Sequence, residues 1–214
     1  MKHHFPIFFF LLLSISCSTP KKVVKANEQF LECIPIEFRE ALALLNESFE
    51  QFLLTNKEEK NLIQFVGSFS RLELPARENF DQKHEALFRH LQESSFESNI
   101  WSVKKEMGVE IELSQDEEQR KKEEENLRIR IRDIDKPYLR CLGSIKEKDM
   151  AVSAYLHTLN NSYGPDAPQD IIAEEILKKI KPNRYDEKIL HTIIGVELYY
   201  SLLKAIYGRS GNRS

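Results

Sequence analysis

Glu197 is the most unusual carboxylate of this chain, because it stands within the strongly apolar run 185–207. A carboxyl group that is buried without a partner has a raised pKa, as general acids often do. Glu197 could therefore act in a hydrolytic reaction together with a histidine, and His157 and His191 are the candidates. The ordinary interpretation is that Glu197 faces solvent or pairs with a basic side chain, and that His157 is a packing or surface residue.

Local motifs of common catalytic and metal sites are missing from the sequence. It has no Gly-x-Ser-x-Gly, no His-Glu-x-x-His, no phosphate-binding loop and no Cys-x-x-Cys. His84 and His90 are six residues apart, which does not fit the spacing of two zinc ligands on one helix. We therefore predict no catalytic motif, no metal site and no cofactor. An active site assembled from distant residues would leave no such motif, so an enzyme stays open as an alternative.

Three cysteines stand at positions 17, 33 and 141. If Cys17 is modified, an even number remains, and Cys33 and Cys141 could form one disulfide in an exported protein. Apolar residues flank both of them, so each could lie on the inner side of a helix. The alternative is a pair of buried free thiols that pack as small apolar groups.

The N-terminus combines a positive charge, a short apolar run and Cys17. Lys2 precedes the apolar residues 5–13. This run is about half as long as the roughly 20 residues of a membrane-spanning helix, and it suits a secretion signal. The sequence Leu-Ser-Ile-Ser-Cys over 13–17 resembles the processing site of bacterial lipoproteins, although Leu13 stands one position early and Ser14 and Ile15 depart from the usual residues.

This resemblance implies a location in the cell envelope. Residues 1–16 would be a lipoprotein signal peptide, Cys17 the lipidated first residue, and 17–26 a tether at the membrane. Ser18 stands where Asp marks inner-membrane retention in enterobacterial lipoproteins, which favours the outer membrane, on its periplasmic or surface side. An ordinary cleaved signal and an uncleaved anchor are the alternatives.

Composition argues against nucleic acid as a partner. The chain has 31 basic and 34 acidic residues and a net charge of −3, and the two signs are interleaved. A weakly acidic protein has no global electrostatic attraction to phosphate backbones. Glycine is scarce, with 7 residues, which suits long helices better than sandwiches or doubly wound sheets.

Apolar residues recur every three or four positions along most of the chain, which predicts an all-α, multi-helix, bundle-like domain over 27–208 and a frayed tail at 209–214. The expected helices cover 36–54, a segment opened by a capping box at 55–58, 77–93, 94–107, 114–134, 146–160, a segment capped by Asp166, and 185–207. The last of these is apolar almost all round, so we expect it in the core or against a partner.

Two segments, 109–113 and 127–132, alternate strictly between apolar and charged residues. Read as strands, they could pair as a ribbon with complementary charges. The second segment also keeps helical spacing that continues to Ile145, and a capping box precedes it at 114–117. We therefore favour a helix over 114–134 and keep the ribbon as the alternative.

The sequence thus predicts a non-enzymatic envelope lipoprotein that binds a protein partner or supports assembly. It would contact the membrane through its lipid anchor and bind no nucleic acid. Two alternatives are kept. One is an envelope-anchored hydrolase built around Glu197, and the other is a small-ligand carrier with a site between apolar helices.

Overall fold

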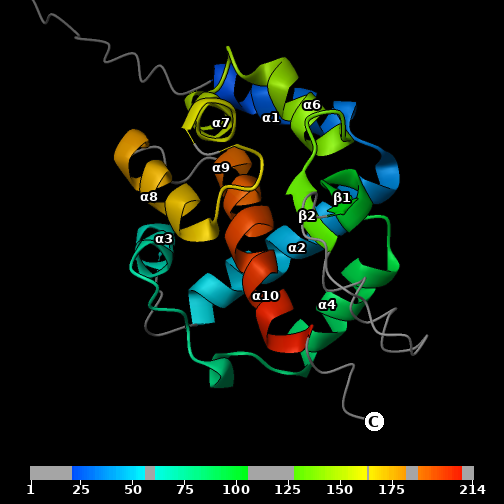
Figure 1. Ribbon diagram of the computed structural model, residues 1–214, viewed down its shortest axis with the longest axis vertical. Coiled ribbons are helices and arrows are strands. Elements are labelled where there is room, and N and C mark those ends of the chain that lie inside the picture. Colours follow the sequence, from blue (N-terminus) through cyan, green and yellow to red (C-terminus); the bar gives the residue numbers. More distant parts are fainter. Residues whose placement is uncertain (1–20, 56–60, 106–127, 163, 182–187, 209–214) are drawn as a thin grey trace, which may run out of the picture.

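Helices form nearly all of the regular structure in the computed structural model, which describes residues 21–55, 61–105, 128–162, 164–181 and 188–208 (Figure 1). The fold is an all-α multi-helix domain, so the predicted class is confirmed. The α-helices are α1 Lys21–Cys33, α2 Ile36–Thr55, α3 Leu62–Ser70, α4 Gln82–Glu93, α6 Pro137–Ile145, α7 Met150–His157, α8 Gln169–Lys179, α9 Lys188–Ile194 and α10 Tyr200–Tyr207. Short 3₁₀ turns cover Arg77–Asn79 and Glu97–Asn99, and π-helical segments cover Thr158–Ser162 and Gly195–Tyr199.

The C-terminal segment is the core of the molecule. α9, the π segment Gly195–Tyr199 and α10 follow one another without a break, and every residue from Thr192 to Tyr200 is buried. By length and composition, Lys188–Tyr207 could cross a membrane, but 72% of its apolar window is buried inside the fold. The prediction that this segment is structural core is confirmed.

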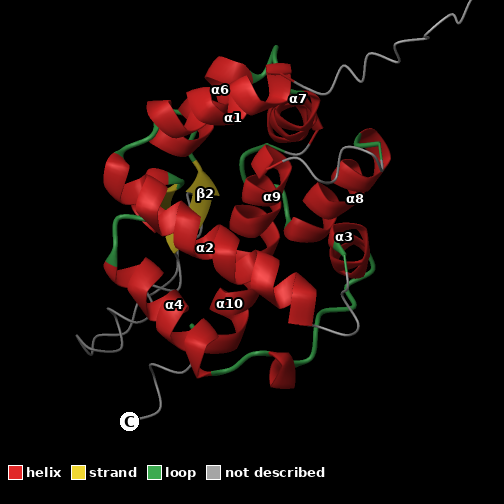
Figure 2. Cartoon of the chain, turned by 180° about the vertical axis from the view of Figure 1, so that it is seen from behind, coloured by secondary structure: helices red, strands yellow, loops and turns green. Residues whose placement is uncertain are grey.

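α2 crosses this central helix at close range, as Figure 2 shows. Asn46 Nδ2 donates to Thr192 Oγ1 at 2.9 Å, and Ser48 Oγ lies 2.9 Å from the Tyr199 hydroxyl. A Cβ added at Gly195 would lie only 3.1 Å from Asn46 Oδ1. A glycine at this position therefore lets the two helices approach each other.

Several predicted helix starts are wrong, and in α3 and α7 the reason is that another side chain caps the helix. α3 starts after Asn61, whose Oδ1 accepts from the Gln64 amide at 3.0 Å, so the predicted capping box at 55–58 does not open it. α7 starts after Asp149, whose carboxylate accepts from two amides of its first turn. α8 follows Pro168 and is not capped by Asp166.

The structure replaces parts of two predicted helices with an antiparallel ribbon. β1, Trp101–Lys105, pairs with β2, Arg128–Arg132, so that Trp101 lies opposite Arg132. The predicted helices over 94–107 and 114–134 are therefore wrong for these residues, and the ribbon alternative is correct for 128–132. The partner of β2 is β1, and 109–113, the partner expected from the sequence, lies outside the described residues. Pairing between strands far apart in sequence outweighs the local helical spacing.

α1 begins inside the predicted tether. Its helix starts at Lys21, and Ala26 and Phe30 are fully buried. The Phe30 ring meets the Tyr138 ring edge-on, with 6.2 Å between centroids, so α1 packs on α6. The chain between Cys17 and the folded domain is therefore shorter than the sequence predicts.

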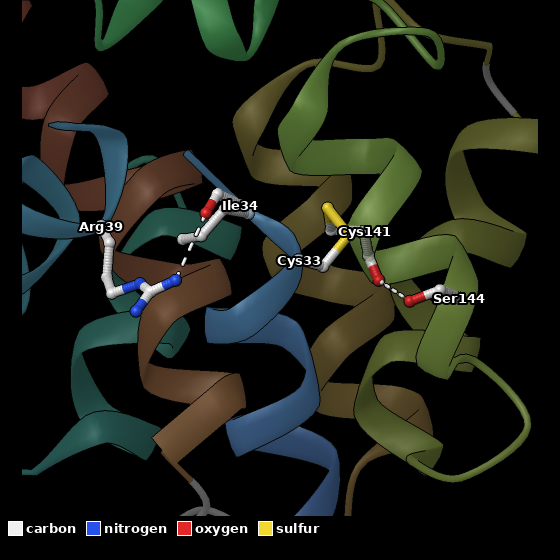
Figure 3. The surroundings of a disulfide bond; sticks show 5 residues. All are labelled: Cys33, Ile34, Arg39, Cys141 and Ser144. Carbon is white, nitrogen blue, oxygen red and sulfur yellow. Dashed lines mark hydrogen bonds between the residues drawn. A yellow bond between two sulfur atoms is a disulfide. The ribbon is translucent and has the colours of Figure 1, made fainter. Parts of the chain in front are cut away.

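A disulfide between Cys33 and Cys141 joins the end of α1 to α6 (Figure 3). Their Cα atoms lie 5.7 Å apart, within the usual range for a disulfide. Cys141 is buried, whereas Cys33 is exposed, so only one half of the bond lies on an inner helix face as expected. The Cys141 carbonyl also accepts from Ser144 Oγ at 2.7 Å.

We predict that reducing this bond lowers the stability of the protein. The bond spans 108 residues of sequence, and the chain-entropy model gives a loop of that size about 4–5 kcal/mol. Urea unfolding with and without reductant measures the loss. Alkylation of the unreduced protein, followed by intact-mass measurement, is the control, and two alkylated thiols in that sample would contradict the pairing.

Candidate functional site

Glu197 lies in the middle of the π segment and has partners at both carboxylate oxygens. Its side chain is 1% exposed, and that of Arg132, at the end of β2, is 5% exposed. Arg132 donates to Oε2 through Nε at 2.7 Å and through Nη2 at 2.6 Å. The Tyr155 hydroxyl of α7 donates to Oε1. The condition for a general acid, a buried carboxyl group without a partner, is therefore not met.

Arg132 also binds the loop before α8. Its Nη1 donates to the carbonyls of Pro165 at 3.1 Å and Ala167 at 2.8 Å. Burial lowers the pKa of the Arg132 guanidinium, but the Glu197 carboxylate more than offsets this, so the pKa is raised overall and the charge is retained. One side chain thus holds together the ribbon, the central helix and the loop.

Two buried tyrosines complete this cluster. Burial raises the pKa of the Tyr155 and Tyr138 hydroxyls well above the ordinary value, and the Glu197 carboxylate raises both further. Both hydroxyls therefore stay protonated. The Tyr138 hydroxyl faces Tyr155, but not at the geometry of a full hydrogen bond. We call Glu197, Arg132, Tyr155 and Tyr138 the buried cluster, and its geometry is that of a structural ion pair.

The two candidate histidines lie in other surroundings. His157 is exposed at the end of α7, where its Nδ1 lies 3.3 Å from Lys179 Nζ. The His191 ring packs against Phe49, with 6.3 Å between centroids. His191 precedes Glu197 by six residues on the same helix, a rise of about 9 Å. The three residues of the sequence hypothesis therefore do not form one catalytic group.

A hollow of about 520 Å³ adjoins the buried cluster. Arg132 forms part of its wall while its guanidinium stays bound to Glu197. This volume falls within the range of small-molecule sites, about 300–1,000 Å³. The other lining residues are Ile131, Asp133, Ile134, Asp135, Leu139, Leu156, Leu159, Asn160, Gly164 and Pro165. We call this the β2 hollow. Its residues come from separate elements, so no local sequence signal could have found it.

A second hollow, of about 430 Å³, lies between α2 and α4 and brings Ser48, Asp81 and His84 into one lining. The contacts of these side chains are structural. Ser48 bonds to Tyr199, while His84 Nδ1 lies 2.7 Å from Asp81 Oδ1 within the capping box of α4. Burial acts to raise the pKa of Asp81, but hydrogen bonds from His84 lower it overall. Of the two histidines of α4, only His90 is exposed.

Within the described ranges, no group of three or more His, Cys, Asp or Glu residues could hold a metal ion. Comparison of the chain with family models, with curated proteins and with solved structures finds no match. The buried cluster and the two hollows are therefore the features that bear on function.

We predict that Glu197→Gln destabilises the fold by about 3 kcal/mol or more, because it leaves the Arg132 charge buried without a counter-charge. Glu85→Gln is the matched control, because Glu85 pairs with Arg89 at 2.7 Å on the exposed face of α4, where a pair contributes about 0.5 kcal/mol. Urea unfolding measures both variants. Equal losses would show that the buried pair has no special role.

Proposed function

We propose that this chain is a lipid-anchored, non-enzymatic protein of the bacterial cell envelope that binds a protein partner through the β2 hollow. The observation that carries the proposal is the hollow itself, which combines leucines in its wall with an exposed isoleucine at its rim. Leu139, Leu156 and Leu159 contribute to the wall. Ile134 at the rim is 59% exposed. An apolar side chain of a partner would remove these groups from water.

The hollow is bounded by groups that are held in place before any partner binds. Arg132 is fixed by Glu197 and by the carbonyls of Pro165 and Ala167. Gly164 has a φ of +80°, a conformation that other residues rarely adopt, and it begins the turn that places Pro165. A preorganised site loses less entropy on binding than a flexible one.

Polar groups near the hollow are engaged in structure, which favours binding over catalysis. Asp133 accepts from the Ser102 hydroxyl and, through Oδ1, from the Asp135 amide at 3.0 Å. Glu197 is fully bound by Arg132 and Tyr155. A nucleophile with an adjacent base, the arrangement that hydrolysis requires, is not among the described lining residues.

Support for the location is the resemblance of residues 13–17 to a lipoprotein processing site. Placement on the outer membrane is part of the same proposal. A second candidate function, small-ligand carriage, is favoured by the volume of the hollow, about 520 Å³, because this is large enough for a small molecule.

We predict that Ile134→Glu abolishes partner capture, because it replaces the exposed apolar side chain of the rim with a charge. Ile36→Glu is the matched control, since Ile36 is 65% exposed on α2 and does not line the hollow. Cross-linking in intact cells, followed by purification and quantitative mass spectrometry, compares both variants with the wild type. A partner captured equally by all three proteins would contradict a role of the hollow.

Native mass spectrometry of the purified protein distinguishes the two candidate functions. A bound small molecule that Ile134→Glu releases would replace the partner-binding proposal with the carrier.

We predict that Cys17→Ala releases the protein from the membrane, because the lipoprotein anchor holds through several acyl chains. Metabolic labelling with a clickable palmitate analogue, followed by membrane fractionation, measures attachment. Label that survives Cys17→Ala would contradict the lipidation site.

A further inference from the structure

The folded domain begins very close to the proposed lipid. α1 starts at Lys21, so only residues 18–20 separate it from Cys17. Four residue steps span at most about 14 Å even when fully extended. The end of the domain that carries the start of α1 must therefore stay near the bilayer.

That end of the molecule is formed by α1, α6 and α7, while α4 and α10 lie at the opposite end (Figures 1 and 2). Lys148, in the turn between α6 and α7, donates to Gln29 of α1 at 2.5 Å. Lys25 lies one turn before Gln29 on α1 and is exposed. The turn and the first half of α1 are therefore neighbours.

Lysines outnumber acidic residues at this end, although the whole chain has a net charge of −3. Lys25, Lys146 and Lys148 are exposed, and Lys21 and Lys22 precede them in sequence. The acidic residues of α1 and of this turn are Glu28, Glu32, Glu147 and Asp149. Asp149 is buried, and Glu147 lies 4.0 Å from Lys146, a loose ion pair. Met150, the first residue of α7, is 46% exposed beside the same turn. We call Lys25, Lys146, Lys148 and Met150 the basic end.

We propose that the basic end rests on the membrane and binds the headgroups of anionic phospholipids. This inference rests on the lipid anchor of the proposed function. The short tether lets these lysines come within the Debye length of the surface, about 8 Å at physiological ionic strength, where their attraction to the headgroups is only partly screened. Met150 adds an apolar side chain that suits the interface. The bound domain then presents α4 and α10 away from the bilayer.

Lysine footprinting on vesicles tests this orientation. The lipidated protein is reconstituted in vesicles of phosphatidylglycerol with phosphatidylethanolamine, or of phosphatidylcholine alone, and attachment is checked by flotation. A water-soluble acetylating reagent then labels accessible lysines for mass spectrometry. We expect labelling of Lys25, Lys146 and Lys148 to fall several-fold on the anionic vesicles and to recover in high salt. Lys83, exposed on α4, is the internal control and keeps its labelling.

A charge-reversal variant tests whether the lysines of the turn cause the protection of Lys25. Lys146→Glu combined with Lys148→Glu should restore the labelling of Lys25 on anionic vesicles, whereas Lys83→Glu should leave its protection unchanged. Equal labelling of all lysines on floating vesicles would overturn the membrane contact while the anchor stands. Equal protection on both kinds of vesicle would overturn the recognition of anionic headgroups. Failure to float would remove the anchor itself, and this inference with it.

Discussion

Burying the guanidinium of Arg132 is the most demanding step in building this fold, because an uncompensated charge in the interior costs several kcal/mol. Glu197 supplies the counter-charge, and the Tyr155 hydroxyl and the carbonyls of Pro165 and Ala167 satisfy the remaining polar groups. These partners come from the central helix, from α7 and from the loop before α8. The pair is satisfied only when all of them are in place, so we infer that it specifies their arrangement more than it adds stability.

The ribbon shows where local sequence patterns stop being informative. Residues 128–132 alternate apolar and basic side chains, yet apolar residues around them also keep helical spacing, so both structures were consistent with the sequence. Two distant interactions decide between them, namely the pairing of β2 with β1 and the bond from Arg132 to a residue 65 positions away. The all-α class and the central helix were predictable, because a long, continuous apolar period leaves few alternatives.

The candidate site, too, could be predicted from the sequence only in part. The sequence could single out Glu197, because a carboxylate in an apolar run needs a partner. The sequence was also consistent with a basic side chain as that partner. It could not identify that partner as Arg132, and it associated Glu197 with His157 and His191, which the fold places elsewhere. Nor could it find the β2 hollow, whose lining combines β2, α6, α7 and the turn at Gly164. Each of these depends on tertiary packing and leaves no periodic signal.

α1 lies between two covalent constraints if Cys17 carries the proposed lipid. A terminal helix is ordinarily the first element to fray. Here Phe30 and Ile34 pack into the core, and Cys33 joins the last residue of the helix to α6. A pull from the membrane is therefore passed through the helix to α6, which contributes Tyr138 to the buried cluster. If the disulfide were reduced at the exposed Cys33, the apolar contacts of α1 and the hydrogen bond from Lys148 to Gln29 would still resist that pull.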